Sequence, residues 1–169
     1  MALSLLLLCA CEKRIELTDS KVTYEGSRLI YEGKSFSGTV IQKFAALAVT
    51  RETTYSEGEI DGEERDVYDN GQTAALRHYE QGKKVGIHEG WYRDGKRRFH
   101  HEYADDRFHG EYWEWFQSGG VFTYARYEKG EAIGRKMWRE DGTIYLNYVF
   151  PAGRAFCTPG AKLCRQVRG

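Results

Sequence analysis

Five histidines and their acidic neighbours are the residues of this 169-residue chain that are best suited to acid–base or metal chemistry. His88 is followed by Glu89, and the adjacent His100 and His101 are followed by Glu102. Imidazole and carboxylate groups are common zinc ligands and common general acids and bases. The pattern therefore raises the hypothesis of a metal or catalytic site. The five residues are His78, His88, His100, His101 and His109.

The positions of these histidines within a 24-residue repeat, described below, argue against such a site. One repeat position is occupied by Thr54, His78, Glu102 and Arg126, and another by Glu64, His88, Tyr112 and Lys136. Such mixtures are typical of interchangeable residues on a solvated sheet face. His100 and His101 should also point to opposite faces of a strand. With no recognisable nucleophile elbow or phosphate loop, we expect no catalytic residue, no metal and no cofactor.

An aromatic cluster is a better candidate for binding. Aromatic side chains anchor protein interfaces and stack on sugars or quaternary amines. Simple packing within a sheet is the alternative, and it is favoured for most of them. The cluster consists of Trp91, Tyr112, Trp113, Trp115 and Phe116.

The charge of the chain argues against nucleic acid as a partner. Lys plus Arg and Asp plus Glu number 25 each, so the net charge is zero and no long-range field attracts a polyanion. The short basic run Lys96–Arg98 is better interpreted as a solvated strand edge than as a nucleic-acid site.

The first residues resemble a bacterial lipoprotein signal. Residues 2–10 form an apolar run that is too short to cross a bilayer and fits the apolar region of a secretory signal. Leu8, a small residue at position 10 and then Cys11 resemble a lipobox, which predicts cleavage before Cys11 and lipidation of its thiol. A short buried N-terminal strand or helix is the alternative. Glu12 directly after this cysteine resembles the residue found in lipoproteins that are sorted to the outer membrane, so we expect the protein to be anchored there and to face the periplasm.

Two further cysteines lie near the C-terminus. In an oxidising envelope, Cys157 and Cys164 are expected to form a disulfide that closes a short hairpin around a Thr-Pro-Gly-Ala turn. Half of a metal site is the alternative, but no histidine or further cysteine lies nearby.

A repeat of 24 residues dominates the rest of the sequence. Tyrosines recur at this interval from Tyr31 to Tyr127, and glycines recur at it from Gly38 to Gly134. Each unit contains two turn signals, one of the Asn70-Gly71 type and one Gly-x-x-x-Gly stretch, between short runs rich in aromatic and β-branched residues. This pattern predicts one β-hairpin per unit, and five units over residues 31–150.

We therefore predict an all-β fold, an elongated single-layer antiparallel meander of tandem 24-residue β-hairpin repeats. Residues 1–10 are expected to be the signal, 11–30 a linker with a first strand, and 151–169 a C-terminal cap. Ala45, Ala46 and Leu47 replace the Asx-Gly turn of later units, which indicates a divergent first unit that caps the array. Tyrosines two strands apart cannot touch, so a side chain from the intervening strand should fill each gap.

The repeat resembles the MORN repeat variant family, also found in proteins described as antitoxin components of toxin–antitoxin systems. The resemblance is carried by the sequences GEYWEWFQSG at 110–119 and GIHEGWYRDG at 86–95, and by the Tyr-x-x-Gly turns between them. It covers about 120 residues and implies an architecture more than a function.

The sequence leaves three kinds of function open. A non-catalytic envelope lipoprotein that docks an unknown protein partner is favoured, since extended repeat surfaces suit docking. A cell-wall glycan or choline-type binder is the second, and an enzyme or metalloprotein is the least favoured. An antitoxin or immunity role follows only from the family resemblance.

Overall fold

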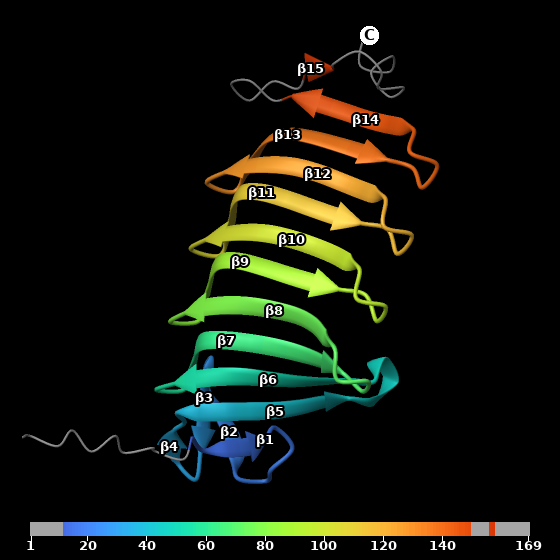
Figure 1. Ribbon diagram of the computed structural model, residues 1–169. Coiled ribbons are helices and arrows are strands. Elements are labelled where there is room, and N and C mark those ends of the chain that lie inside the picture. The colour runs from blue at the N-terminus through green and yellow to red at the C-terminus, as the bar shows by residue number, and fades with distance from the viewer. Residues whose placement is uncertain (1–11, 150–155, 158–169) are drawn as a thin grey trace, which may run out of the picture.

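The computed structural model describes residues 12–149 and 156–157, and most of these residues form β-strands. One sheet of twelve strands dominates the described part of the chain, and its strands stack into an elongated, bowed ribbon (Figure 1). From β5 onward each strand pairs antiparallel with the next along the chain, whereas β1 pairs parallel with β5. The strands in spatial order are β1 (Arg14–Glu16), β5 (Gly38–Phe44), β6 (Val49–Ser56), β7 (Glu59–Tyr68), β8 (Thr73–Glu80), β9 (Lys83–Trp91), β10 (Arg97–Ala104), β11 (Arg107–Trp115), β12 (Val121–Glu128), β13 (Glu131–Trp138), β14 (Ile144–Val149) and β15 (Phe156–Cys157).

This arrangement confirms the predicted fold class. Strands β7, β9, β11 and β13 begin at residues 59, 83, 107 and 131, which are 24 residues apart. The sheet does not close on itself, because β1 lies at one end of its strand order and β15 at the other. Each strand from β7 to β13 packs mainly against its two neighbours in the sheet, so the repeat is a single layer there.

The first kind of turn joins β6 to β7 and recurs in every later unit. It has two residues, and both adopt positive φ, as in a type I′ hairpin turn. Glu57-Gly58, Gln81-Gly82 and Lys129-Gly130 follow this pattern, and Asp105-Asp106 forms the same turn without glycine. The second amide of each turn donates to a carbonyl 22 residues earlier in the chain, for example Gly82 N to Ile60 O at 2.7 Å. These turns are therefore tied to the preceding unit.

The second kind of turn contains the Asx-Gly signal. Only the glycine has positive φ, for example 84° at Gly71. Its amide donates to Tyr68 O, and Asn70 Oδ1 accepts from the amide of Gln72. The geometry is that of a type I turn followed by a left-handed glycine, which is a common longer hairpin loop. The Asx-Gly signal therefore marks a turn, as predicted, and its glycine supplies the positive φ within a four-residue loop between Tyr68 and Thr73.

The N-terminal end contains more structure than the linker and single strand expected from the sequence. Strands β2 (Val22–Glu25), β3 (Arg28–Tyr31) and β4 (Lys34–Ser35) form a separate three-stranded sheet. Between the two sheets lies a small hydrophobic core of Ile15, Leu29, Phe36 and Val40. A 3₁₀ turn at Ala45–Leu47 replaces the Asx-Gly turn of the first unit. This end is the divergent cap of the array.

The two faces of the large sheet differ in burial. The face that carries Tyr55, Tyr79, Tyr103 and Tyr127, here called the tyrosine face, also carries nearly all the buried residues of the repeat. They include Thr53, Glu64, Asp66, Ala75, His88, Thr123 and Ala125. Within the described residues, no second layer covers the side chains of β7–β13, so their low exposure comes from close packing against one another on the bowed face.

The tyrosine column confirms the expected gap filling. The His88 ring lies 5.6 Å from that of Tyr79 and 4.5 Å from that of Tyr103, between the two. Phe108 lies in the same way between Tyr103 and Tyr127, at 4.7 and 5.0 Å. Aromatic contacts therefore run continuously across the later units.

Candidate functional site

All four tryptophans of the chain lie on the face opposite the tyrosine column, here called the tryptophan face. Trp91 is on β9, Trp113 and Trp115 are on β11, and Trp138 is on β13. All four are partly exposed, and the strands that carry them make their main contacts within the sheet. Tryptophan is the most enriched residue type at binding hot spots, so this face is the candidate functional site.

Near the loops that follow β9 and β11, the tryptophan face combines Trp91 and Trp115 with an arginine. Arg97 on β10 is paired with Trp91 in the strand register, and its guanidinium lies 5.9 Å from the ring centroid of Trp115. Arg97 Nη2 also lies 4.0 Å from Glu89 Oε1. An exposed guanidinium beside indole rings is a feature of protein-binding surfaces.

A second group of side chains on this face, Trp113, Tyr124 and Lys136, lies farther from these loops. Trp113 is paired with Tyr124 of β12, with ring centroids 4.2 Å apart, and Tyr124 is paired with Lys136 of β13. The Lys136 ammonium lies 5.1 Å from the ring centroid of Trp138. The rings of Trp113 and Trp115 are nearly parallel, at 13°, with centroids 5.9 Å apart. Aromatic and cationic side chains thus alternate along the tryptophan face.

The structure divides the aromatic cluster predicted from the sequence. Trp91, Trp113 and Trp115 share the tryptophan face, whereas Tyr112 belongs to the tyrosine face and stacks on His101 at 4.0 Å. Phe116 follows β11 and packs against Phe122 at 5.1 Å. Trp138 and Tyr124 complete the face and were not among the predicted binding residues. The sequence does contain a signal for them. Residues two apart on a strand share a face, so Trp113, paired through Tyr124 with Lys136, places Trp138 on the same side of the sheet.

The tyrosine face contains a partly buried network of four charges. Arg51 donates to both carboxylate oxygens of Asp66, at 2.7 and 3.0 Å, and Arg77 Nη1 bridges Asp66 Oδ2 and Glu64 Oε1 at 3.0 and 2.9 Å. Burial alone would raise the pKa of Asp66, but the two guanidinium groups outweigh it and hold that pKa below its usual range. Thr53 donates to Glu64 as well.

The interpretation of Glu64 and His88 as interchangeable surface residues is wrong. Their exposed fractions are 6% and 3%, and His88 Nε2 lies 2.9 Å from the carbonyl oxygen of His78. Burial lowers the pKa of His88. Different residue types at one repeat position here fit different local neighbours: Arg77 beside Glu64, and two tyrosines beside His88.

The other histidines are dispersed. His100 lies on the tryptophan face with Glu89 and Glu102, at 3.3 and 3.4 Å, whereas His101 lies on the tyrosine face, which confirms that the two point to opposite sides of β10. Within the described residues, no three His, Cys, Asp or Glu side chains are grouped so that they could hold a metal ion.

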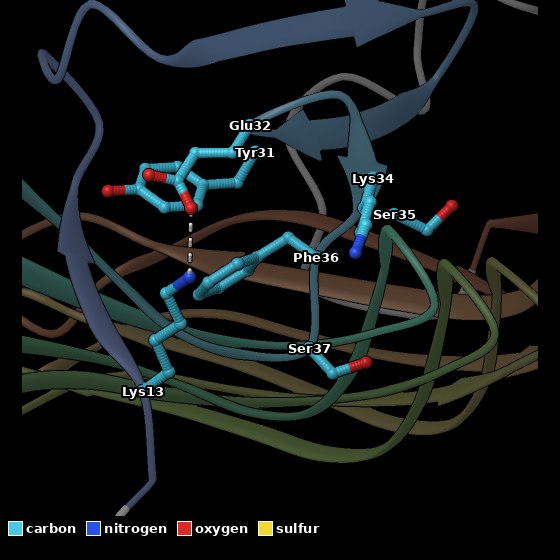
Figure 2. A pocket seen from close by; sticks show the side chains of 7 residues that line it. All are labelled: Lys13, Tyr31, Glu32, Lys34, Ser35, Phe36 and Ser37. Atoms are coloured by element: carbon cyan, nitrogen blue, oxygen red, sulfur yellow. Dashed lines mark ion pairs between the residues drawn. The ribbon is translucent and has the colours of Figure 1, made fainter.

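A hollow of about 340 Å³ lies at the N-terminal cap (Figure 2). Figure 2 shows the Lys13 side chain reaching from below toward Glu32 and Tyr31, with the Phe36 ring beside it. Lys13 Nζ lies 3.8 Å from Glu32 Oε2 and 4.2 Å from the Tyr31 ring centroid. Glu32 also pairs with Lys21, and this second cation helps to lower the pKa of Glu32. The Glu32 carboxylate is therefore shared by two lysines, and Lys34 adds a further positive charge to the lining of this hollow.

Comparisons with known proteins add no family to these observations. No protein-family model matches the chain, and a search of curated proteins finds no match. In the part of the chain that the structure describes, no helix has the length and apolar character needed to span a membrane. Cys11 and Cys164 lie outside the described residues, so lipidation and the disulfide to Cys157 stay predictions.

Proposed function

We propose that the protein is a non-catalytic binding module of the bacterial cell envelope that docks a protein partner on its tryptophan face. The observation that carries this proposal is the gathering of all four tryptophans on one side of a single-layer sheet. Packing of the sheet does not require this asymmetry, because the tyrosine face is already filled by tyrosine, histidine and phenylalanine rings.

A protein is the best-supported class of partner because of the residues that accompany the tryptophans. Arg97, Lys136 and Tyr124 lie among the indole rings, and Trp, Tyr and Arg are the residue types enriched at hot spots. Glu89, Glu102 and Glu111 lie on the same face and provide acidic groups. The mixed charge suits a partner surface with polar groups of both signs and does not suit a polyanion.

A cell-wall glycan is the second candidate, and one observation favours it. The stacked, nearly parallel rings of Trp113 and Trp115 offer an aromatic platform, on which a sugar ring could stack. Alternation with Arg97 and Lys136 interrupts this platform, which is why the protein partner ranks first.

We also propose that the module is attached to the membrane through a lipid on Cys11, as the lipobox-like sequence suggests. Replacing Cys11 with Ala should move the protein from the membrane fraction to the soluble fraction. The resemblance to MORN repeat variant proteins suggests an immunity-type role as one form of docking, in which the partner would be a toxin.

Crosslinking in intact cells tests the docking proposal. The wild type, the double variant Trp113→Ala/Trp115→Ala and the control Tyr24→Ala would be compared, since Tyr24 is an aromatic residue that is 54% exposed and lies on β2, in the small sheet. A partner captured by the wild type and by the control should be lost from the double variant. With the purified partner, affinity should fall about 30-fold or more.

Two results would count against docking through this face. One is a partner captured equally well by the double variant, provided that circular dichroism shows an intact sheet in that variant. The other is tryptophan-dependent sedimentation of the protein with isolated cell walls without any captured protein, which would favour the glycan alternative.

A further inference from the structure

A second hollow, of about 350 Å³, lies at the edge of the tyrosine face, next to the Asx-Gly loop of the second unit. Ala74, 4% exposed, belongs to its lining, and side chains of β5, β6, β7 and β10 surround it. The volume is at the lower end of the range for small-molecule sites. The lining residues are Phe44, Leu47, Val49, Arg51, Asp66, Tyr68, Ala74, Arg77 and Arg98.

The hollow exists because small residues interrupt the repeat at this place. Ala74 and Ala75 occupy positions that hold Arg98 and Phe99 in the next unit. On the intervening strand, Gly90 has no side chain, and a Cβ atom there would lie 2.1 Å from the Phe99 ring. The Phe99 ring therefore occupies the space over Gly90, whereas the small side chain of Ala74 leaves a gap between the β5–β6 end and Arg98.

One guanidinium at this hollow has no counter-charge. Arg51 and Arg77 are both paired with Asp66, as described above. Arg98 is partly buried, and no hydrogen bond or ion pair joins its side chain to another described residue; its recorded contact is with the Phe99 ring, at 5.2 Å. A half-buried cation without a partner is unfavourable unless an anion approaches it. The lining contains three arginines and one aspartate.

The opposite wall of the hollow is apolar. Phe44, Leu47 and Val49 come from the first unit, and Tyr68 comes from β7 with its hydroxyl turned to the carbonyl of Trp91 at 2.9 Å. Leu47 is 66% exposed, so its apolar side chain is accessible to a ligand at this wall. An apolar surface facing an unpaired guanidinium matches a ligand with an apolar body and one anionic end.

We propose that this hollow binds a compact apolar carboxylate, with Arg98 pairing the carboxylate and the Phe44–Leu47–Val49 wall covering the apolar body. The planar fork of a guanidinium matches a carboxylate in bidentate geometry. The site lies on the opposite face from the tryptophans, so it is independent of the proposed docking function. Two sources share this chemistry: a free carboxylic acid and the C-terminus of a peptide that ends in an apolar residue.

Titrations followed by two-dimensional NMR test the proposal on the full chain. The probes are phenylacetate and its neutral amide, and a tripeptide that ends in Phe with a free or an amidated C-terminus. Phenylacetate, the free peptide or both should shift the amide signals of Val49, Ala74 and Arg98, whereas the neutral forms should not. Binding of phenylacetate alone identifies a free acid as the source, and binding of the free peptide alone identifies a C-terminus.

Three variants sharpen the test. Arg98→Met should weaken carboxylate binding about tenfold or more, as expected for loss of a charged hydrogen-bonded pair. Arg97→Met makes the same change one residue earlier, on the tryptophan face, and should leave the affinity unchanged. Ala74→Phe introduces the residue that the fourth unit has at this position, Phe122, and should fill the hollow and abolish binding.

Several outcomes would overturn the proposal. One is that neither carboxylate binds at about 10 mM, a concentration well above a millimolar dissociation constant. Another is that the neutral amides bind as well as the carboxylates. A third is that Arg97→Met and Arg98→Met weaken carboxylate binding equally. Because Arg98→Met could perturb folding, its circular dichroism spectrum and the independent Ala74→Phe result keep the test decisive. Loss of partner capture in the tryptophan variants with carboxylate binding intact would separate the two proposals.

Discussion

His101 should make the sheet sensitive to mild acid. Its ring lies between those of Tyr112 and Phe99, with centroids 4.0 and 4.8 Å away, and its side chain is 15% exposed. Its Nε2 atom has no hydrogen-bond partner within the described residues. The nearest carboxylate oxygen, Glu114 Oε1, is 4.0 Å away and accepts from the Tyr112 hydroxyl instead. Burial, with smaller contributions from nearby positive charges, lowers the pKa of His101 to about 4.

The sign and the size of the effect follow from this lowered pKa. The unfolded chain, with a pKa of 6.5 at this residue, binds a proton more readily than the folded chain does. Stability is therefore complete above about pH 6.5 and falls as the pH is lowered toward 4. Between pH 7 and pH 5 the loss of unfolding free energy from this one group should be about 2 kcal/mol, and it should approach about 3 kcal/mol below pH 4.

The variant His101→Phe isolates this contribution, because it keeps an aromatic ring in the stack and removes the titration. Urea denaturation of both proteins, followed by tryptophan fluorescence at pH 7, 6 and 5, would give the two pH profiles. The wild type should lose about 2 kcal/mol more than the variant from pH 7 to pH 5. Titration of the His101 ring by NMR should also give a pKa near 4. Parallel profiles, or a ring that titrates near 6.5, would refute the reasoning.

Three further predictions concern stability and can be measured by urea denaturation. Tyr68→Phe removes the hydrogen bond to the Trp91 carbonyl and should cost about 1 kcal/mol, whereas the same change at Tyr124, which is held by its contact with the Trp113 ring, should cost little. Gly82→Ala, at φ +80°, should cost about 1 kcal/mol or more, and Gly120→Ala, where φ is not positive, should cost less; equal losses would contradict the turn assignment. Asp66→Asn leaves Glu64 as the one remaining carboxylate beside Arg51 and Arg77 and should cost about 2–4 kcal/mol at pH 7. This difference from the wild type should shrink below pH 4 as Asp66 itself is protonated, and a loss that does not change with pH would contradict the ion-pair assignment.

The repeat made the fold predictable from the sequence. Tyrosines and glycines at a fixed interval specified the hairpin units, and the Asx-Gly dipeptides marked one edge of the sheet. The residues of the type I′ turns could not be identified in this way. Glu57, Gln81 and Lys129 adopt positive φ because two-residue turns must match the twist of the strands, and these residue types give no hint of it.

The candidate site was predicted only in part. The aromatic cluster predicted from the sequence combined Tyr112 and Phe116 with three tryptophans, whereas alternation along β11 turns Tyr112 to the tyrosine face and Phe116 packs on Phe122 beyond the strand. The burial of His88 was missed because a comparison of repeat positions averages over units, whereas burial depends on the rings of Tyr79 and Tyr103 on either side. The hollow at Ala74 is lined by residues from β5 to β10 that lie far apart in the sequence, and only the register of the strands brings them together.

The two long edges of the ribbon differ in how their turns are held, and this difference has a consequence for engineering. At one edge, each type I′ turn hydrogen-bonds to the preceding unit, as Gly130 does to Phe108. At the other edge, the backbone bonds that close the loops after β9, β11 and β13 stay within each loop. Foreign peptides should therefore be accepted in those loops and rejected at the type I′ edge.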